Sequence, residues 1–239
     1  MLALVPARGG SKSIPRKNVL LVNGKPLIAW SIEHGLAARL VTRVICTTDD
    51  EEIARVAAAH GAEVPFRRPP DLSGDTAVDY GFHRHALEWL QEHEGYVPDL
   101  VVQLRPTHPV RRPEVIDRAI ELLAGHPEAD SLRAVRRVTF TPYKMWRAGP
   151  DGLLTPLLAL AGCHEPYNQP RGLLPEVLQQ DGYVDITRPS TVYELASTTG
   201  QKILPFFVDD EPEIDIDYPS DLVAAQRLIQ EQRRGRGLP

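Results

Sequence analysis

Residues 2–18 read LALVPARGGSKSIPRKN, a short apolar run followed at once by a loop rich in glycine, serine and basic residues. A continuous apolar run of this length is typical of a strand buried on both faces. In the loop, two adjacent glycines let backbone N–H groups approach a ligand closely, and Arg8, Lys12 and Lys17 add positive charge. The stretch therefore predicts a strand that leads into an anion-binding loop, with a flexible surface turn as the alternative.

Apolar runs and helical patterns alternate along the rest of the chain. Further buried strands are predicted at residues 44–47, 100–102 and 203–208. Helices are predicted to begin at the capping sequence 48–51, between Thr76 and Asp79, and at three prolines, Pro26, Pro113 and Pro219. This alternation predicts an α/β fold with right-handed crossovers and a mainly parallel sheet. Ligands of such sheets collect at the carboxyl ends of the strands, where loops 7–18, 47–50 and 103–112 must lie.

The pattern changes between residues 130 and 195, where short strand-like runs alternate with proline, glycine and polar turns. We interpret this segment as a β-rich lobe inserted into a single domain that spans residues 1–230, with a dimer contact as its expected role. The Arg-rich residues 231–239 are expected to form a flexible tail.

Charge is distributed unevenly along the chain, although the formal net charge is only −5. Residues 1–32 contain five basic and no acidic side chains, whereas residues 209–217 contain six acidic and no basic ones. The pair of runs suggests a polyanion bound by the first segment and a divalent cation bound by the second. The mild net acidity argues against a nucleic-acid-binding protein.

The acidic run ends in Glu213-Ile-Asp215-Ile-Asp217. On an extended segment, side chains two residues apart point the same way, so Asp215 and Asp217 can share one cation. Mg²⁺ takes one or two carboxylates together with phosphate oxygens and water, which fits this pair. The alternative is a helix-capping aspartate ahead of Pro219, beside a solvated acid.

Two further segments carry charges that fit either a substrate or a structural role. Arg105 and Arg111 lie in a loop with two prolines that they could simply help to shape. Gln169, Arg171 and Lys144, in the predicted insertion, could supply polar and positive groups for a carboxylate. The 8 histidines show no metal-binding spacing, and the 2 cysteines form neither a disulfide framework nor a zinc cluster. No apolar run is long enough to cross a bilayer and no signal peptide is evident, so a cytoplasmic protein without a membrane partner is expected.

Several motifs, taken in order, resemble the acylneuraminate cytidylyltransferases, or CMP-sialic acid synthetases. They are Val5-Pro-Ala-Arg-Gly-Gly-Ser-Lys12 to Lys17-Asn18, Asn23-Gly-Lys-Pro-Leu27, Arg68-Pro69 to Asp75-Thr76, Pro106-Thr-His-Pro-Val-Arg111, Gln169-Pro-Arg171 to Leu174-Pro175, and Ile214-Asp-Ile-Asp217 to Asp221-Leu222. The resemblance covers nearly the whole chain. It implies a Rossmann-like nucleotidyltransferase domain with a dimerising insertion, and hence a homodimer.

The implied reaction transfers CMP from CTP to a nonulosonic acid, a 2-keto-3-deoxy sugar acid, and releases pyrophosphate. Residues that match the nucleotide-binding positions are Arg8, Gly9, Ser11, Lys12, Lys17, Asn18, Lys25 and Arg68. Asp215 and Asp217 match the family's Mg²⁺ pair. Substrate contacts are expected from Arg105, Lys144, Gln169, Arg171 and Asp185, and catalysis from Arg8, Lys12, Lys17 and Asp217. The general base is left open between a hydroxyl activated by the metal and one of the two aspartates.

Two segments depart from the sialic acid enzymes. Those enzymes read Leu-Gln-Pro-Thr-Ser-Pro where this chain has Leu104-Arg-Pro-Thr-His-Pro109, and Asn-Gly-Ala-hydrophobic-Tyr where it has Asp181-Gly-Tyr-Val-Asp185; Arg105 and Asp185 are the changes that leave sialic acid itself uncertain. The acceptor is therefore open among sialic, legionaminic and pseudaminic types or another 2-keto sugar acid. Two rival functions are a metal-dependent sugar-nucleotide glycosyltransferase, which also uses Asp-x-Asp, and a non-catalytic nucleotide-binding module.

Overall fold

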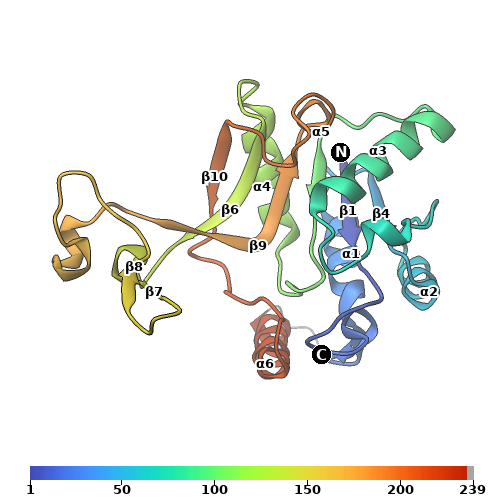
Figure 1. Ribbon diagram of the computed structural model, residues 1–239. Coiled ribbons are helices and arrows are strands. Elements are labelled where there is room, and N and C mark those ends of the chain that lie inside the picture. The colour runs from blue at the N-terminus through green and yellow to red at the C-terminus, as the bar shows by residue number, and fades with distance from the viewer. Residues whose placement is uncertain (236–239) are drawn as a thin grey trace. The chain divides into compact units, whose positions relative to one another are not determined.

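The computed structural model describes residues 1–235 and places a six-stranded sheet at the centre of the fold, in the order β10-β6-β9-β5-β1-β4 (Figure 1). Its strands are β1 (Leu2–Pro6), β4 (Arg43–Thr47), β5 (Val101–Gln103), β6 (Ser131–Arg137), β9 (Leu178–Thr187) and β10 (Ile203–Phe207). Two hairpins lie outside it, β2 (Leu21–Val22) with β3 (Lys25–Pro26) and β7 (Trp146–Ala148) with β8 (Leu154–Pro156). The helices are α1 (Leu27–Ala37), α2 (Glu51–Ala59), α3 (Asp79–Glu94), α4 (Pro113–Ala124), α5 (Pro189–Glu194) and α6 (Pro219–Gly235).

Strand β1 is the central strand of the parallel part of the sheet. It pairs in parallel with β4 on one side and β5 on the other, and β5 in turn pairs antiparallel with β9. Residues Leu2 to Val5 are fully buried, as the apolar run at the start of the chain predicts. The predicted mainly parallel α/β architecture is confirmed.

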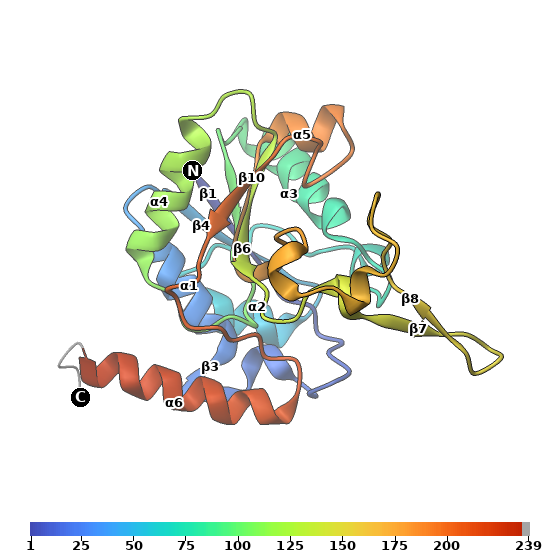
Figure 2. The same ribbon diagram turned by 90° about the vertical axis from the view of Figure 1, so that its left-hand side faces the viewer.

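Helices cover both faces of this sheet (Figure 2). Ala3 and Val5 of β1 point to one face and join the core that α1, α2 and α4 build. Leu2 and Leu4 point to the other face and join the core that α3 and α5 build. Successive strand residues alternate between faces, so β1 needs apolar side chains at every position.

A third apolar cluster joins the two ends of the chain. Ile214 and Ile216 are buried together with Val22, Leu27 and Trp30 of the N-terminal segment, and α6 contributes Ala225 and Ile229. The backbone N–H of Ile216 also donates to the carbonyl oxygen of Thr107, at 2.8 Å. Since Ile214 and Ile216 are buried, the intervening Asp215 and the following Asp217 are exposed, in the alternation expected of an extended segment.

Three sequence expectations about local structure need correction. The strand predicted to be buried at 203–208 is β10, which lies at the edge of the sheet and has largely exposed side chains. Helix α2 is capped by Asp50, whose carboxylate accepts from the N–H of Ile53, rather than by Thr48. Helix α3 begins at Asp79, and Thr76 does not cap it, because its N-cap is Val78 and no side chain accepts from its first turn.

Residues Val135–Gln180 form a second compact unit, which contains the β7–β8 hairpin and three short 3-10 helices. This unit is narrower than the predicted insertion 130–195, because residues 131–134 and 181–187 belong to strands of the central sheet within the first unit. Helix α6 continues through Gly235, so residues 231–235 of the predicted tail are helical. Residues 236–239 of the predicted tail lie outside the described residues. No helix in residues 1–235 is long and apolar enough to span a bilayer.

Candidate active site

A pocket of about 600 Å³ opens at the carboxyl ends of β1 and β5. Four segments of the first unit supply its wall: the loop after β1, the segment between Arg68 and Phe82, the loop after β5, and the acidic segment before α6. Among the sequence-predicted residues, the pocket lining includes Arg8, Ser11, Lys12, Lys17, Asn18, Arg68, Arg105, Asp215 and Asp217. The fold thus places the predicted ligand-binding loops at the carboxyl ends of the parallel strands, where such sheets collect their ligands.

Lys17 connects the basic and acidic segments directly. Its ammonium donates to the carbonyl oxygen of Ile216 at 2.7 Å and lies 3.2 Å from a carboxylate oxygen of Asp217. The Lys17 side chain is 11% exposed, whereas that of Asp217 is 62% exposed. The predicted meeting of the two charged segments in one crevice is confirmed, and the carboxylate faces the open side of the contact.

The other loop cations gather at Asp75. One carboxylate oxygen lies 3.2 Å from Nη1 of Arg8, and the other pairs with the ammonium of Lys12. Arg8 also donates to the carbonyl oxygen of Gly74 at 2.8 Å. The hydrogen bond from Lys12 and the nearby positive charges hold the pKa of Asp75 below its ordinary value. Arg8 and Lys12 are therefore both paired with one carboxylate of the pocket lining, that of Asp75.

At Gly9 the backbone of the loop after β1 lies close to Asp49 and Asp50. Its N–H donates to a carboxylate oxygen of Asp49 at 3.0 Å, so the loop is held against the residues that follow β4. A Cβ atom at this position would lie only 2.8 Å from a carboxylate oxygen of Asp50. The side-chain amide of Asn18 donates to the carbonyl oxygen of Arg8 at 3.0 Å and fixes the other side of the loop.

Arg68 forms a buried part of the pocket wall, with 5% of its surface exposed. Its guanidinium donates to the hydroxyl of Thr47 at 3.1 Å and to the Thr47 carbonyl oxygen, and it lies 4.6 Å from the ring centroid of Phe82. Burial lowers its pKa to about 10, so the group remains protonated at neutral pH. Arg68 therefore adds a permanent, buried positive charge to the pocket wall.

Of the predicted acceptor residues, Arg105 lines the pocket and Asp185 is buried behind it, 3.2 Å from the Arg105 guanidinium. Asp79, which the sequence marked only as a helix start, also lines the pocket and binds Arg105 at 2.6 Å. Burial alone would raise the pKa of Asp79, but the charge of Arg105 and hydrogen bonds from Gln103 and Arg105 hold it below its ordinary value. Sequence reasoning missed Asp79 because an aspartate at a helix start has an ordinary structural explanation.

Other predicted residues lie elsewhere. Lys25 is not part of the pocket lining; it pairs with Glu33 and lies 4.1 Å from the ring centroid of Trp30. Arg111 is fully buried, and of its two proposed roles the structure favours the shaping of the loop.

The acceptor residues predicted in the insertion, Lys144, Gln169 and Arg171, belong to the second unit. Within that unit Lys144 is exposed, and Arg171 donates to the carbonyl oxygen of Val138 at 2.6 Å. Their contacts with an acceptor remain predictions.

Asp215 and Asp217 offer a donor set that fits Mg²⁺. Both carboxylates line the pocket that the cationic loop also lines. Within the described residues, no group of three or more histidine, cysteine or acidic side chains is arranged to hold a metal. A pair of carboxylates without further protein ligands leaves positions for phosphate oxygens and water, which is the coordination that Mg²⁺ prefers.

Comparison with known proteins gives one consistent family. The sequence model for the cytidylyltransferases matches residues 2–147, more than half of the chain. The pseudaminic acid cytidylyltransferase of Campylobacter jejuni is 42% identical over 120 residues, which span 50% of this chain and about half, 51%, of that relative. The CMP-N,N'-diacetyllegionaminic acid synthase of Legionella pneumophila is 29% identical over 96% of both chains. The N-acylneuraminate cytidylyltransferase of Escherichia coli is 29% identical over 98% of this chain and 53% of that enzyme.

Solved structures show the same architecture. A CMP:2-keto-3-deoxy-manno-octonic acid synthetase complexed with CTP matches with a TM-score of 0.69 at 17% identity, over 97% of this chain and 98% of that one. A 4-diphosphocytidyl-2C-methyl-D-erythritol synthase matches with a TM-score of 0.63 at 14% identity, over 95% and 97% of the two chains. At these identities the likeness concerns the fold alone, and it confirms the predicted Rossmann-like nucleotidyltransferase fold.

Proposed function

The chain belongs to the cytidylyltransferase family, and we propose that it transfers CMP from CTP to the anomeric hydroxyl of an N-acylated nonulosonic acid, releasing pyrophosphate. The observation that carries this proposal is the contact of Lys17 with Ile216 and Asp217, which joins the cationic loop to a carboxylate pair in one pocket. The acceptor class is supported by two relatives that match nearly this whole chain and are named for N-acylated acids.

The phosphate chain of CTP would lie along Arg8, Lys12 and Lys17. The acceptor hydroxyl attacks the α-phosphorus, a new P–O bond forms, and the bond to the bridging oxygen breaks so that pyrophosphate departs. The cations stabilise the negative charge that builds up on the leaving group. The hydroxyl proton must leave in the same step, and Asp215 and Asp217 are carboxylates of the lining that can accept it.

We further propose that Asp215 and Asp217 hold a Mg²⁺ ion in the working enzyme. When bound there, the ion would supply Lewis-acid stabilisation of phosphate oxygens. The segment that carries the two aspartates is held in position, because Ile214 and Ile216 are buried and Lys17 donates to the carbonyl oxygen of Ile216.

The proposed reaction is tested with a panel of acceptors. We expect pyrophosphate release that requires CTP, Mg²⁺ and one N-acylated nonulosonic acid of sialic, legionaminic or pseudaminic type. A coupled assay of pyrophosphate with each acid in turn measures it; UTP and an eight-carbon 2-keto-3-deoxy acid serve as controls. A folded sample that releases no pyrophosphate with any acid and does not bind CTP would eliminate the proposal.

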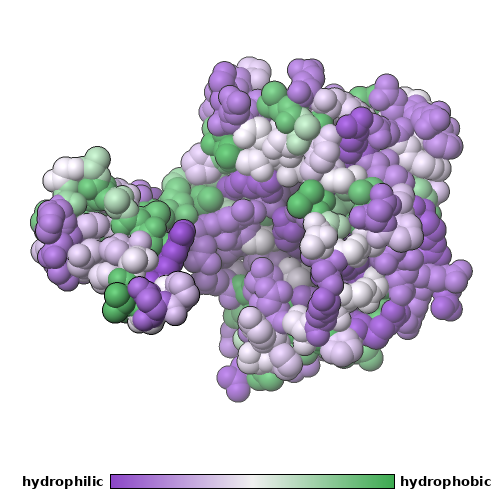
Figure 3. Space-filling view, in the orientation of Figure 1, coloured by the Kyte–Doolittle hydropathy of each residue, from purple (hydrophilic) through white to green (hydrophobic). Residues whose placement is uncertain are grey.

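We also propose that the second unit mediates homodimer formation. This unit of residues 135–180 exposes several large apolar side chains, a feature typical of interaction surfaces (Figure 3). They are Phe140, Met145, Trp146, Leu153, Leu154, Leu158 and Leu173, of which Phe140 is 80% exposed. We take a second copy of the chain as the partner of this surface, because most soluble oligomers are two-fold homo-oligomers in which the same patch of both copies meets.

Light scattering after size-exclusion chromatography tests this assembly. We expect the mass of a dimer for the unaltered protein and a shift toward the monomer for Phe140→Asp, because a charge in an apolar interface costs binding energy. Val97→Asp is the matched control, since Val97 is an exposed apolar residue of the first unit. A monomeric unaltered protein, or equal effects of both substitutions, would contradict the proposal.

A further inference from the structure

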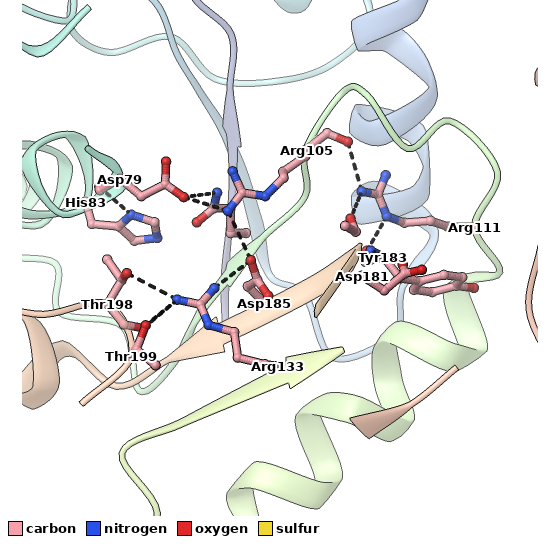
Figure 4. Close-up of polar contacts among 12 residues, drawn as sticks. Asp79, His83, Arg105, Arg111, Arg133, Asp181, Tyr183, Asp185, Thr198 and Thr199 are labelled. Carbon is pink, nitrogen blue, oxygen red and sulfur yellow. Dashed lines mark hydrogen bonds and ion pairs between the residues drawn. The ribbon is translucent and has the colours of Figure 1, made fainter. Parts of the chain in front are cut away.

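Charged side chains of alternating sign run from the pocket into the protein (Figure 4). Asp79 binds Nη2 of Arg105 at 2.6 Å, and the same nitrogen lies 3.2 Å from Asp185. Asp185 in turn binds Nη1 of Arg133 at 2.6 Å. Asp79 and Arg105 line the pocket, whereas Asp185 is buried. This row of charged side chains therefore has one end that faces the pocket and one end inside the protein.

Neighbouring groups fix both ends of this charged chain. The amide of Gln103, itself buried, donates to Oδ2 of Asp79 at 3.0 Å. At the other end, Nη2 of Arg133 donates to the hydroxyls of Thr198 and Thr199, at 3.2 and 2.8 Å. A partly buried network with partners on every side holds its members in one arrangement.

The pocket-facing pair keeps hydrogen-bonding groups for a ligand. Both bonds from Arg105 to carboxylates leave from Nη2, and the two side-chain bonds that Asp79 accepts go to Oδ2. Within the described residues, Nε and Nη1 of Arg105 and Oδ1 of Asp79 make no hydrogen bond. Donor and acceptor atoms therefore stand side by side on one wall of the pocket.

The charge of this wall selects the kind of ligand group. Arg105 lies between two carboxylates, so its positive charge is balanced and a further carboxylate would be repelled by Asp79. A neutral group with one acceptor and one donor fits better. A secondary amide has this pattern, because its carbonyl oxygen can accept from Arg105 while its N–H donates to Asp79.

We propose that Asp79 and Arg105 form the subsite for an N-acylamino group of the acceptor, and that Asp185 is the positioning residue that holds Arg105 in place. This inference rests on the proposed function and deepens it, because it names the group of the sugar that is recognised. Arg105 and Asp185 are also among the positions that depart from the sialic acid enzymes, and the structure places them in contact.

The test compares two acceptors: the best N-acylated acid of the panel and its counterpart with hydroxyl groups in place of the N-acyl groups. We expect the unaltered enzyme to prefer the N-acylated acid by about 10- to 100-fold in kcat/KM. Arg105→Lys and the isosteric Asp79→Asn should each reduce this preference by about tenfold or more, with the KM for CTP changed less than about twofold.

Asp185→Asn should reduce the same preference, and combined with Arg105→Lys it should add nothing, because Asp185 acts through Arg105. Glu211→Gln is the matched control: it removes a buried carboxylate from the guanidinium of Arg112, outside the pocket lining, and should leave the preference unchanged.

Three results would overturn the inference while leaving cytidylyl transfer intact: no preference in the unaltered enzyme, an unchanged preference in Arg105→Lys and Asp79→Asn, or a rise confined to the KM for CTP. An unaltered protein that neither binds CTP nor turns over any acid would instead overturn the proposed function, and the inference with it.

Discussion

Asp217→Asn is expected to abolish turnover while the protein stays folded. The Asp217 carboxylate lines the pocket beside Lys17, and asparagine keeps its shape but removes its charge. If Asp217 holds Mg²⁺ as proposed, its loss should lower kcat by about 100-fold or more, equivalent to about 2.7 kcal/mol of transition-state stabilisation. The measurement is pyrophosphate release as a function of Mg²⁺ concentration, together with the thermal midpoint. The remaining activity should require more Mg²⁺ than that of the unaltered enzyme.

The control for this substitution is Asp210→Asn. Asp210 belongs to the same acidic run and is exposed, but it does not line the pocket. The Asp210→Asn substitution removes the same charge from the same segment, so general effects of net charge appear in both variants. The stability cost of Asp217→Asn should be small because its ion pair with Lys17 is largely solvent-exposed on the carboxylate side. Turnover equal to that of Asp210→Asn would remove Asp217 from the proposed metal site.

The meeting of the two chain ends could be predicted because each charged segment carries its own signal. The basic loop directly follows β1, whose apolar residues predict a buried strand of the sheet. A loop that follows such a strand must lie at its carboxyl end. In the acidic segment, alternation of buried isoleucines with aspartates fixes which side chains face outward. Local patterns of this kind survive in the fold because tertiary packing reinforces them.

Side-chain partners over long separations could not be predicted in the same way. Lys25 belongs to a basic segment, yet Glu33 and Trp30 on the following helix attract it away from the pocket. Asp79 binds Arg105, which lies in a loop after a different strand, so no short motif contains both. The exposure of β10 likewise depends on its place at the sheet edge, since its own sequence is as apolar as that of an inner strand.

Arg111 shows how a structural role can be hidden in a motif that resembles a substrate-binding one. Its guanidinium is fully buried, and every one of its nitrogens donates to the protein. The acceptors include the hydroxyl of Ser31 at 2.9 Å and the carbonyl oxygens of Arg105, His108, Gly182 and Tyr183. Burial lowers its pKa to about 10, which still leaves the charge in place at neutral pH. The side chain thus joins α1, the loop after β5, and β9.

Arg111→Met is expected to be the most destabilising substitution that leaves the pocket lining itself unaltered. Methionine has similar length, but it leaves several buried carbonyl oxygens without a donor; each such loss typically costs about 1–3 kcal/mol, so we expect a total of about 3–5 kcal/mol. For a chain of this size the thermal midpoint should fall by about 6–20 °C. The thermal midpoint of Arg111→Lys should lie between that of the unaltered protein and that of Arg111→Met, because lysine keeps the charge but offers fewer donors.

Differential scanning calorimetry of the purified variants measures the effect, with Arg118→Met as the control because Arg118 is exposed on α4. The control should change the midpoint by no more than about 2 °C, as surface substitutions usually do. Since Arg111 supports the backbone of Arg105 and Gly182, activity should decline in step with the folded fraction rather than through a change in KM. An Arg111→Met protein as stable as the control, but with a raised KM for either substrate, would instead show that Arg111 contacts the ligand.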